Sequence, residues 1–416
     1  MVRKPYLPRI TDTLLAARLA DFAAVMVVGP RASGKTTTAS RFAKTTFRLD
    51  RPADAAAISS DPDVQLADLP TPILIDEWQL FPAVLGAVKR AVDEDSTPGR
   101  FILAGSARSD ALASGWPATG RLVRVNQWGL TRRELEGDVG APSFFDTAFG
   151  GGLAALAAPA QALDLRDYIE LALIGGFPEV ALHDSASRRT HWLRSYVDQL
   201  LTTDAPSLGE HRDPRRLHRY LRAVAANTAG VVEHKTLYDA AGITRVTGSR
   251  YDSLLELLML TEQVAPWSTN QLSRLTRSPK RHLIDPALLG PLLGLEPRAV
   301  LRNAELLGRL IDSFVLAQLR PEREASKVSP TLYHLRQEHG RREIDLIAEA
   351  PDGRVVAIEI KASSSPDAAA AEHLCWLRDR LGDNFCAGVV FHTGPQLFLL
   401  DDRVFALPIS VLWTRA

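Results

Sequence analysis

The chain has 416 residues, of which 46% are apolar and 24% charged, and its 49 basic side chains balance 49 acidic ones. This length exceeds one hydrophobic core, so two or three domains are expected, and the zero net charge excludes an overall attraction to nucleic acid. Any basic surface must therefore be local. Two cysteines without a paired framework indicate a reducing compartment, and no apolar stretch is long enough to span a membrane. We expect a cytoplasmic protein without membrane contact.

The first third of the chain alternates short apolar runs with amphipathic stretches. Helices are predicted at residues 10–22, 36–45 and 81–93, and buried strands at residues 23–28, 47–50, 72–76 and 100–105. Strands that alternate with helices are typical of a parallel sheet with helices on both faces. The sequence thus predicts an α/β fold for residues 1–140.

The rest of the chain divides into two parts that differ in the spacing of their apolar residues. Residues 137–165 are rich in Gly, Ala and Pro and are interpreted as a linker or a loosely packed connection, and residues 165–262 have helical spacing. After a predicted helix at 304–320 the period changes to two, with strands expected at 331–336, 343–348, 355–360, 387–392 and 396–400 and a helix at 368–381. We therefore predict a helical middle domain at 165–295 and a smaller α/β domain at 300–416.

A phosphate-binding motif stands between the first buried strand and the next helix. The segment matches G-x-x-x-x-G-K-[ST] in full, and the predicted nucleotide contacts are Gly29, Pro30, Arg31, Ala32, Ser33, Gly34, Lys35, Thr36 and Thr37. Glycines let successive backbone N–H groups face one centre, and the lysine reaches the β- and γ-phosphates. Thr36 is the predicted Mg²⁺ ligand. This motif predicts binding of ATP, or a close relative, with Mg²⁺.

Other candidate residues of the nucleotide site follow later strands. Asp76 and Glu77 end the strand at 72–76, where Asp76 is expected to hold Mg²⁺ through water and Glu77 to polarise the attacking water. Ser106 follows the next strand and is a candidate contact of the γ-phosphate or the water. Arg121 is a candidate for stabilising developing charge, in cis or across a subunit boundary, with an exposed structural arginine as the alternative.

These segments together resemble a family of bacterial and archaeal P-loop ATPases of the AAA superfamily. The likeness is carried by Gly29–Thr36 with Asp76 and Glu77, and further by residues 6–9, 49–50, 101–106, 120–122, 130–134, 175–179, 278–285 and 308–315. In that family the ATPase is fused to a C-terminal domain of uncharacterised function. The resemblance covers nearly the whole chain and implies ATP hydrolysis, whereas it implies little about the biological role.

The order of the elements predicted for residues 212–282 is typical of a winged helix. Three helices are predicted at 215–227, 233–241 and 244–260, followed by strands at 261–265 and 280–284 that flank a basic loop. The segment carries twelve basic residues against six acidic ones. Arg245, Arg250 and Arg274 are the candidate contacts to DNA phosphates. A winged helix that serves as a lid or a protein contact is the alternative.

The C-terminal domain contains a D-x(n)-E-x-K pattern. Glu359 and Lys361 lie two apart on a predicted strand, so their side chains share a face, and a hairpin turn can bring Asp345 beside them. Two carboxylates, Asp345 and Glu359, could bind Mg²⁺ or Mn²⁺, and Lys361 could orient a water. Asp312 is a weaker candidate carboxylate. The pattern and the element order resemble the restriction-endonuclease-like fold, and an inert hairpin with a Glu359–Lys361 ion pair is the alternative.

Two functions agree with this organisation. The first is an ATPase that couples ATP to DNA binding or processing, with or without Mg²⁺- or Mn²⁺-dependent nuclease activity. The second is a nucleotide-dependent switch or scaffold whose inactive nuclease-like domain binds protein partners. The sequence leaves open whether the chain forms oligomers.

Overall fold

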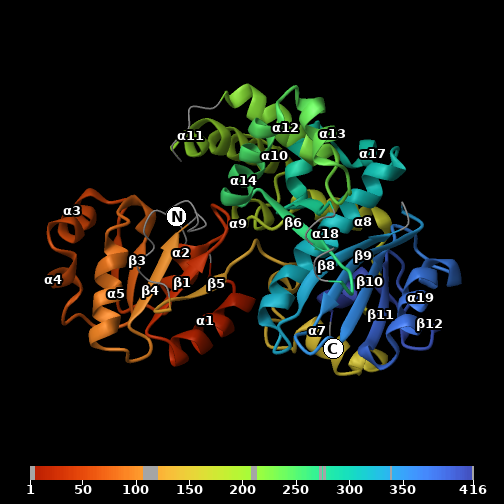
Figure 1. Ribbon diagram of the computed structural model, residues 1–416, viewed down its shortest axis with the longest axis horizontal. Coiled ribbons are helices and arrows are strands. Elements are labelled where there is room, and N and C mark those ends of the chain that lie inside the picture. Colours follow the sequence, from red (N-terminus) through yellow and green to blue (C-terminus); the bar gives the residue numbers. More distant parts are fainter. Residues whose placement is uncertain are drawn as a thin grey trace. The chain divides into compact units, whose positions relative to one another are not determined.

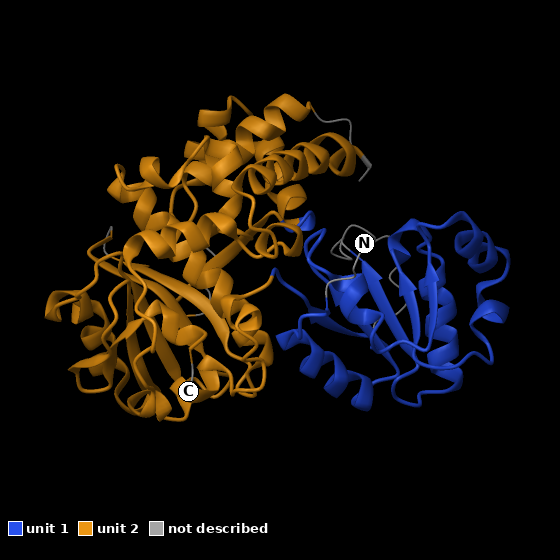
Figure 2. Cartoon of the chain, turned by 180° about the vertical axis from the view of Figure 1, so that it is seen from behind, with its two compact units in different colours: residues 1–129, 257–259 blue, residues 130–256, 260–416 orange. Residues whose placement is uncertain are grey.

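The computed structural model describes residues 5–105, 120–207, 213–270, 274, 278–337 and 340–414. The chain divides into two compact units (Figure 2), residues 1–129 with 257–259 and residues 130–256 with 260–416. Each unit has its own sheet (Figure 1). None of the helices within the described ranges is long and apolar enough to cross a membrane.

Unit 1 contains a parallel sheet with the strand order β2-β3-β4-β1-β5 among its described residues. The strands are β1 (Ala24–Val28), β2 (Thr45–Arg48), β3 (Ile73–Asp76), β4 (Phe101–Gly105) and β5 (Val123–Asn126). The helices are α1 (Ile10–Asp21), α2 (Lys35–Ala39), α3 (Pro52–Ser60), α4 (Pro62–Leu66) and α5 (Val84–Glu94). The α/β fold predicted for this part is confirmed, although α2 ends earlier than the expected helix at 36–45.

Both faces of this sheet are covered, as the continuous apolar strands require. Along β1, Met26 and Val28 pack in a core with α5 residues such as Val88. The intervening Val25 and Val27 belong to a second core on the opposite face, with Leu15, Leu19 and Ala39 of α1 and α2. The alternating sides of one strand thus hold helices against both faces of the sheet.

Unit 2 is built around a mixed sheet with the strand order β12-β13-β11-β10-β9-β8-β6-β7. The strands are β6 (Thr261–Pro266), β7 (Lys280–Leu283), β8 (Thr331–Gln337), β9 (Arg342–Glu349), β10 (Val355–Ile360), β11 (Phe385–His392), β12 (Phe398–Asp401) and β13 (Val404–Pro408). Its helices are α6 (Arg132–Leu135), α7 (Phe144–Phe149), α8 (Leu165–Ile174), α9 (Pro178–Ala181), α10 (Ala186–Gln199), α11 (Ala205–Ser207), α12 (Pro214–Ala226), α13 (His234–Ala241), α14 (Arg245–Leu257), α16 (Leu289–Leu293), α17 (Pro297–Val300), α18 (Ala304–Ala325) and α19 (Glu372–Leu381). The mixed C-terminal sheet agrees with the predicted α/β class.

Residues 137–165 are not simply a linker, contrary to the interpretation of their composition. Phe144 and Phe145 of α7 are fully buried, and the Phe144 ring lies 5.4 Å from the ring of Phe391 on β11. The neighbouring Val390 points to the opposite core, which includes Leu374 and Leu377 of α19. Helices α7 and α19 therefore cover opposite faces of the sheet. The contact between Phe144 and Phe391, rather than the average composition, decides how this segment packs.

The predicted winged-helix elements are present as α12, α13 and α14 followed by the antiparallel strands β6 and β7. Strand β6 also pairs in parallel with β8, with Ala265 opposite Tyr333. The two expected wing strands therefore continue the C-terminal sheet. Hydrogen bonds cross the predicted boundary between 165–295 and 300–416, so these two segments form a single compact unit in the structure. The three-domain division remains a prediction.

Candidate nucleotide site and C-terminal charge cluster

The phosphate-binding loop connects the carboxyl end of β1 to α2. Ala32 and Gly34 have positive φ angles of 59° and 91°, which curl the backbone. A Cβ atom at Gly29 would lie 2.0 Å from the carbonyl oxygen of Gln127, so only glycine fits there. The loop conformation thus depends on the glycines of the motif and on a neighbouring segment that the motif does not include.

The Lys35 side chain is folded back onto the loop. Its Nζ donates to the carbonyl oxygens of Gly29 at 3.0 Å and Pro30 at 2.8 Å, and only 7% of the residue is exposed. Burial lowers the pKa of Lys35 to about 8, whereas the carboxylates of Glu77 and Asp76 oppose that shift. A buried ammonium whose partners are neutral carbonyls is suited to exchange them for an anion.

Thr36 and Asp76 meet beside the loop, as the sequence led us to expect. The Thr36 Oγ1 donates to Asp76 Oδ1 at 3.0 Å. The other oxygen, Oδ2, is buried without a hydrogen-bond partner in the described structure, and Arg48 Nε lies 3.9 Å from it. Burial raises the pKa of Asp76, and the hydrogen bond from Thr36 counteracts this. A hydroxyl and an unsatisfied carboxylate oxygen are ligands that fit a hard divalent cation.

Glu77 follows β3 in a left-handed conformation, with a φ angle of 53°. A non-glycine residue in this region is strained, and such strain is concentrated at functional sites. Its Oε2 accepts a hydrogen bond from the Gln79 side chain. Trp78, the next residue, is fully buried in the core. Glu77 is half-buried directly after β3, at the sheet edge that carries the loop, and its charge acts on Lys35.

A buried arginine at the start of the chain donates hydrogen bonds to the phosphate-binding loop and to a neighbouring segment. The motif alone did not reveal this residue. Arg9 is 4% exposed, and its guanidinium donates to the carbonyl oxygens of Ser33 at 3.0 Å and Trp128 at 2.8 Å. The side-chain amide of Gln127 also donates to the carbonyl oxygen of Ser33, at 3.0 Å. The only signal in the sequence was the place of residues 6–9 among the segments that carry the family resemblance.

Arg121 does not join the nucleotide site of its own unit. It precedes β5, whose first residue pairs with Val25, so it lies at the amino edge of the sheet, whereas the loop follows the carboxyl end of β1. Its Nε is 2.8 Å from Asp93 Oδ1 near the end of α5. The amino and carboxyl edges of the sheet are about 15 Å apart, because a strand rises by about 3.3 Å per residue. The sequence left open whether Arg121 acts in cis or across a subunit boundary. In the described structure it lies at the edge opposite the loop of its own unit, because parallel strands place the two loops at opposite edges. Ser106 lies outside the described residues.

Unit 2 brings the predicted C-terminal residues together. Lys361 Nζ is 2.6 Å from Glu359 Oε1, and the Ile360 amide donates to Asp345 Oδ2 at 2.9 Å. Burial raises the pKa of Glu359 to about 8, with a further contribution from the charge of Asp345. Burial alone would also raise the pKa of Asp345, but the Lys280 ammonium outweighs it and lowers that pKa.

Lys280 is the member of this cluster that the sequence did not reveal. Its Nζ lies 2.5 Å from Asp312 Oδ2 and 2.9 Å from Asp345 Oδ1, and the side chain is 2% exposed. Both oxygens of Asp345 are thus engaged within the chain. Within the described ranges, no group of three or more His, Cys, Asp or Glu side chains is placed to hold a metal ion. The donor set as it stands does not fit the Mg²⁺ or Mn²⁺ expected there, because an ammonium lies between two of the carboxylates.

The three arginines predicted to contact DNA differ in their surroundings. Arg245 and Arg250 are exposed on α14. Arg274 is bound within unit 2, since its guanidinium makes two hydrogen bonds to Glu349, at 2.6 and 3.0 Å, and lies 4.6 Å from the centre of the Tyr333 ring. Only 12% of its side chain is exposed. The pairing of β6 with β8 carries Arg274 to the C-terminal sheet, where its guanidinium is engaged by Glu349.

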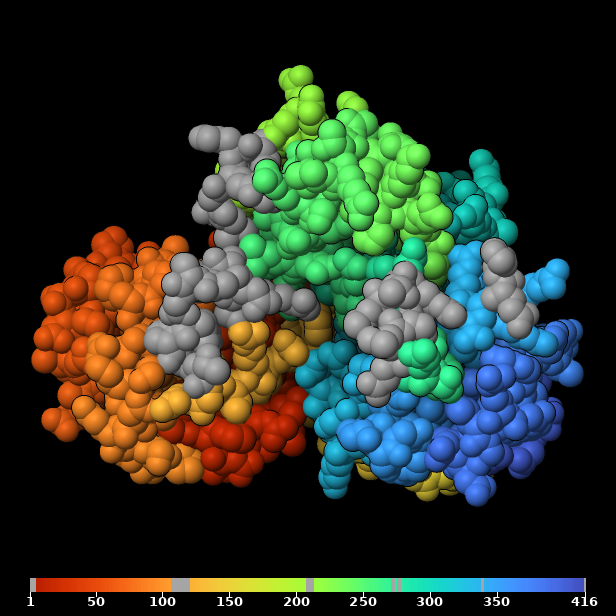
Figure 3. All heavy atoms as spheres, in the orientation of Figure 1, coloured from red at the N-terminus to blue at the C-terminus, as the bar shows by residue number. Residues whose placement is uncertain are grey.

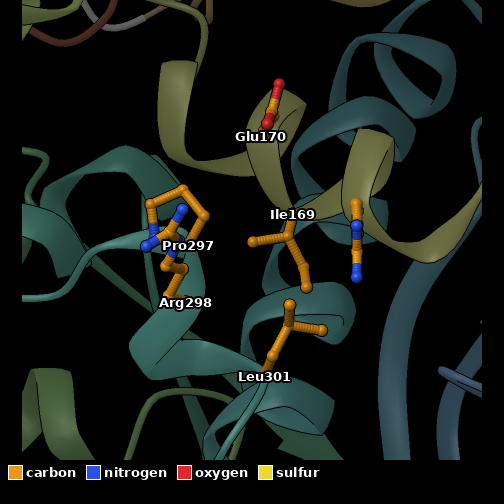
Figure 4. A pocket seen from close by; sticks show the side chains of 6 residues that line it. Ile169, Glu170, Pro297, Arg298 and Leu301 are labelled. Atoms are coloured by element: carbon orange, nitrogen blue, oxygen red, sulfur yellow. The ribbon is translucent and has the colours of Figure 1, made fainter.

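A separate hollow of about 320 Å³ lies between α8 and α17 (Figure 4). It is lined by Arg166, Ile169, Glu170, Pro297, Arg298 and Leu301. None of the residues predicted to be functional lines it. We therefore assign it no part in the nucleotide site or the charge cluster.

Comparison with protein families defines the class of the first unit. Residues 21–136 match an AAA domain, and together with the parallel sheet and the phosphate-binding loop this match supports ATP binding and hydrolysis. Residues 165–299 and 307–412 match two domains of unknown function, DUF8612 and DUF4143. The resemblance to restriction endonucleases is not confirmed, because neither description names an activity.

Two curated relatives match over most of the chain. They are the uncharacterized proteins Mb2031c of Mycobacterium bovis and Rv2008c of Mycobacterium tuberculosis, each 29% identical over 397 residues, covering 94% of this chain and 81% of the relative. Among solved structures, a Walker-type ATPase of Pyrococcus abyssi has a TM-score of 0.42 at 14% identity, with 70% of this chain and 97% of that chain covered. A Thermotoga maritima RuvB variant has a TM-score of 0.29 at 18% identity, with 66% and 90% covered. These structural likenesses are too low to bear on activity.

Proposed function

We propose that the chain binds ATP with Mg²⁺ in unit 1, hydrolyses it, and couples this cycle to DNA binding by unit 2. The observation that carries the proposal is the meeting of Thr36 and Asp76 at 3.0 Å beside the buried Lys35. Thr36 and Asp76 would hold Mg²⁺, directly or through water, and the ion would neutralise charge on the phosphates. Thr36 lies on α2 and Asp76 at the end of β3, so their meeting reflects the fold as well as the motif.

The roles of the other side chains follow from their present contacts. Lys35 would exchange the carbonyl oxygens of Gly29 and Pro30 for β- and γ-phosphate oxygens. Glu77, at the same sheet edge, would orient the attacking water. Arg9 would hold the loop open through Ser33 and would not touch the nucleotide. Arg121 is left with a role in trans or a structural one.

The DNA part of the proposal rests on exposed basic side chains in residues 213–257. Figure 3 shows this segment in green on the outer surface of unit 2. Its exposed basic residues are Arg215, Arg216, Arg219, Arg222, Lys235, Arg245 and Arg250. Clustered lysines and arginines on one small module are the electrostatic footprint of phosphate-backbone binding.

The ATPase part is tested by measuring phosphate release from Mg·ATP. Lys35→Ala and Asp76→Asn should each lower the turnover by roughly two to three orders of magnitude. The first removes the ammonium group that would contact the phosphates, and the second removes the carboxylate charge that would hold Mg²⁺. Lys44→Ala, which removes an exposed lysine of the same unit, should leave the rate unchanged. A folded Lys35→Ala protein with wild-type turnover would overturn the assignment.

The DNA part needs a salt titration of affinity for duplex, single-stranded and branched DNA, with and without Mg·ATP. Arg245→Ala/Arg250→Ala should weaken binding and reduce the slope of log affinity against log salt by about 2. Arg298→Ala/Arg302→Ala removes two exposed arginines outside residues 213–257 and serves as the charge-matched control. Failure to bind any of these DNA forms at low salt would exclude this part.

A second candidate is a nucleotide-dependent switch whose C-terminal unit binds a protein partner without cutting DNA. The observation that favours it is the pairing of Lys280 with both Asp312 and Asp345, which engages carboxylates that a nuclease would need for metal. In that case Mg·ATP would change no DNA affinity, and the chain would show no Mn²⁺-dependent nicking. Nicking that is lost in Lys361→Ala would decide for the nuclease instead.

A further inference from the structure

The buried cluster of unit 2 contains one more carboxylate than ammonium groups. We define it as Lys280 of β7, Asp312 of α18, Asp345 of β9, and Glu359 and Lys361 at the end of β10. Lys280 is shared by Asp312 and Asp345, whereas Lys361 pairs with Glu359 alone. Three carboxylates thus face two ammonium groups. The third carboxylate has no ammonium group of its own. A buried carboxylate without a cationic partner has to take up a proton or bind a cation.

Two oxygens of the cluster are unsatisfied. Asp312 Oδ1 and Glu359 Oε2 are buried and make no hydrogen bond in the described part of the chain. Both residues are 7% exposed. Lys361, with 38% of its side chain exposed, is the member of the cluster nearest to solvent. The cluster therefore has the oxygen atoms of a cation site, but the space between Asp312 and Asp345 is filled.

The filling group is Lys280. A divalent cation shared by Asp312 and Asp345 would lie within about 2.0–2.6 Å of an oxygen of each carboxylate. The Lys280 Nζ lies 2.5 and 2.9 Å from those oxygens, so the ammonium and the metal would occupy the same space. Strand β7, which carries Lys280, is the last strand of the sheet and belongs to the segment predicted as a wing. The wing thus provides the cation.

We propose that Lys280 is a tethered cation that takes the place of a divalent metal ion in this cluster. While Lys280 is in place, the cluster does not bind Mg²⁺ or Mn²⁺, and removal of its ammonium group leaves a place for a divalent cation between Asp312 and Asp345. This inference goes beyond the proposed ATPase and does not depend on it. It also gives the segment of residues 278–285 a chemical role.

The test uses Mn²⁺ alone, without nucleotide, on the full chain. Free Mn²⁺ is measured by electron paramagnetic resonance as protein is added. Lys280→Ala should bind one Mn²⁺ more per chain than wild type, and Mn²⁺ should raise the melting temperature of this variant but not that of wild type. Lys280→Ala/Asp345→Asn should lose the additional ion, and Lys280→Arg, which keeps a cation, should not gain it.

Two results would overturn the proposal. One is a folded Lys280→Ala protein that binds no more Mn²⁺ than wild type. The other is Mn²⁺ binding by wild type that Glu359→Gln abolishes, since the cluster would then accept metal with Lys280 present. This second comparison does not need Lys280→Ala to fold. ATP hydrolysis is measured on the same samples, so failure of the ATPase proposal is seen separately.

Discussion

Asp285 accepts a hydrogen bond from the backbone amide of Gly176, with 2.8 Å between Oδ2 and the nitrogen. Its other oxygen, Oδ1, accepts from the Ala287 amide at 2.9 Å. Gly175 has a φ angle of 74°, and a Cβ atom there would lie 2.2 Å from Asp285 Oδ1. Two segments that carry the family resemblance, 175–179 and 278–285, therefore meet at one buried carboxylate.

Asp285→Ala should destabilise unit 2. The substitution leaves the amides of Gly176 and Ala287 buried without an acceptor, which lowers the free energy of unfolding by about 2–4 kcal/mol. Urea unfolding followed by tryptophan fluorescence measures this loss. Asp352→Ala, at an exposed turn of the same unit, should leave the unfolding midpoint where it is. Equal midpoints for Asp285→Ala and wild type would show that the contact is dispensable.

The pH dependence of stability should change in Asp285→Asn. Burial raises the pKa of Asp285 to about 6, although the amides of Gly176 and Ala287 oppose the shift. The folded chain keeps this proton to higher pH than the unfolded chain, whose carboxyl has a pKa of about 4. The contribution to stability is therefore complete below pH ~4 and is lost as the pH rises through ~6, a change of about 3 kcal/mol. Asp285→Asn should lack this decline, and parallel stability curves for the two proteins would contradict the assignment.

Arg9→Ala should weaken nucleotide binding although Arg9 is not expected to touch the nucleotide. Loss of the hydrogen bonds to Ser33 and Trp128 leaves the loop carbonyls without their charged donor, and a charged hydrogen bond contributes about 1.5–3 kcal/mol. We expect the dissociation constant for a fluorescent ATP analogue to rise by roughly 10- to 100-fold. The control is Arg51→Ala, an exposed arginine of the same unit. Unchanged affinity with an unchanged circular dichroism spectrum would argue against this role of Arg9.

Arg121→Ala should leave ATP hydrolysis in dilute protein unchanged. The side chain lies at the amino edge of the sheet and pairs with Asp93, so it cannot reach a nucleotide held at the carboxyl edge of its own unit. The measurement is turnover over a range of protein concentrations. A lower rate for the variant only at high concentration would indicate a role in a neighbouring subunit. A lower rate at every concentration would contradict this placement.

The candidate nucleotide site could be predicted from the sequence because its parts are local. The segment Gly29–Thr36 is contiguous, and Asp76 is placed by the strand that precedes it, so a motif and a hydrophobic run were enough to predict that Thr36 and Asp76 meet. The pair Glu359 and Lys361 was predictable for the same reason, because residues two apart on a strand share a face.

Only the tertiary structure decided the relationships that join distant segments. Lys280 and Asp345 are 65 residues apart, and their contact depends on how β7 continues the C-terminal sheet. Arg274 pairs with Glu349 for a related reason, since β6 aligns with β8. The position of Arg121 follows from the direction of β5. Strand order and register are set by the packing of the whole unit, which no short window of sequence contains.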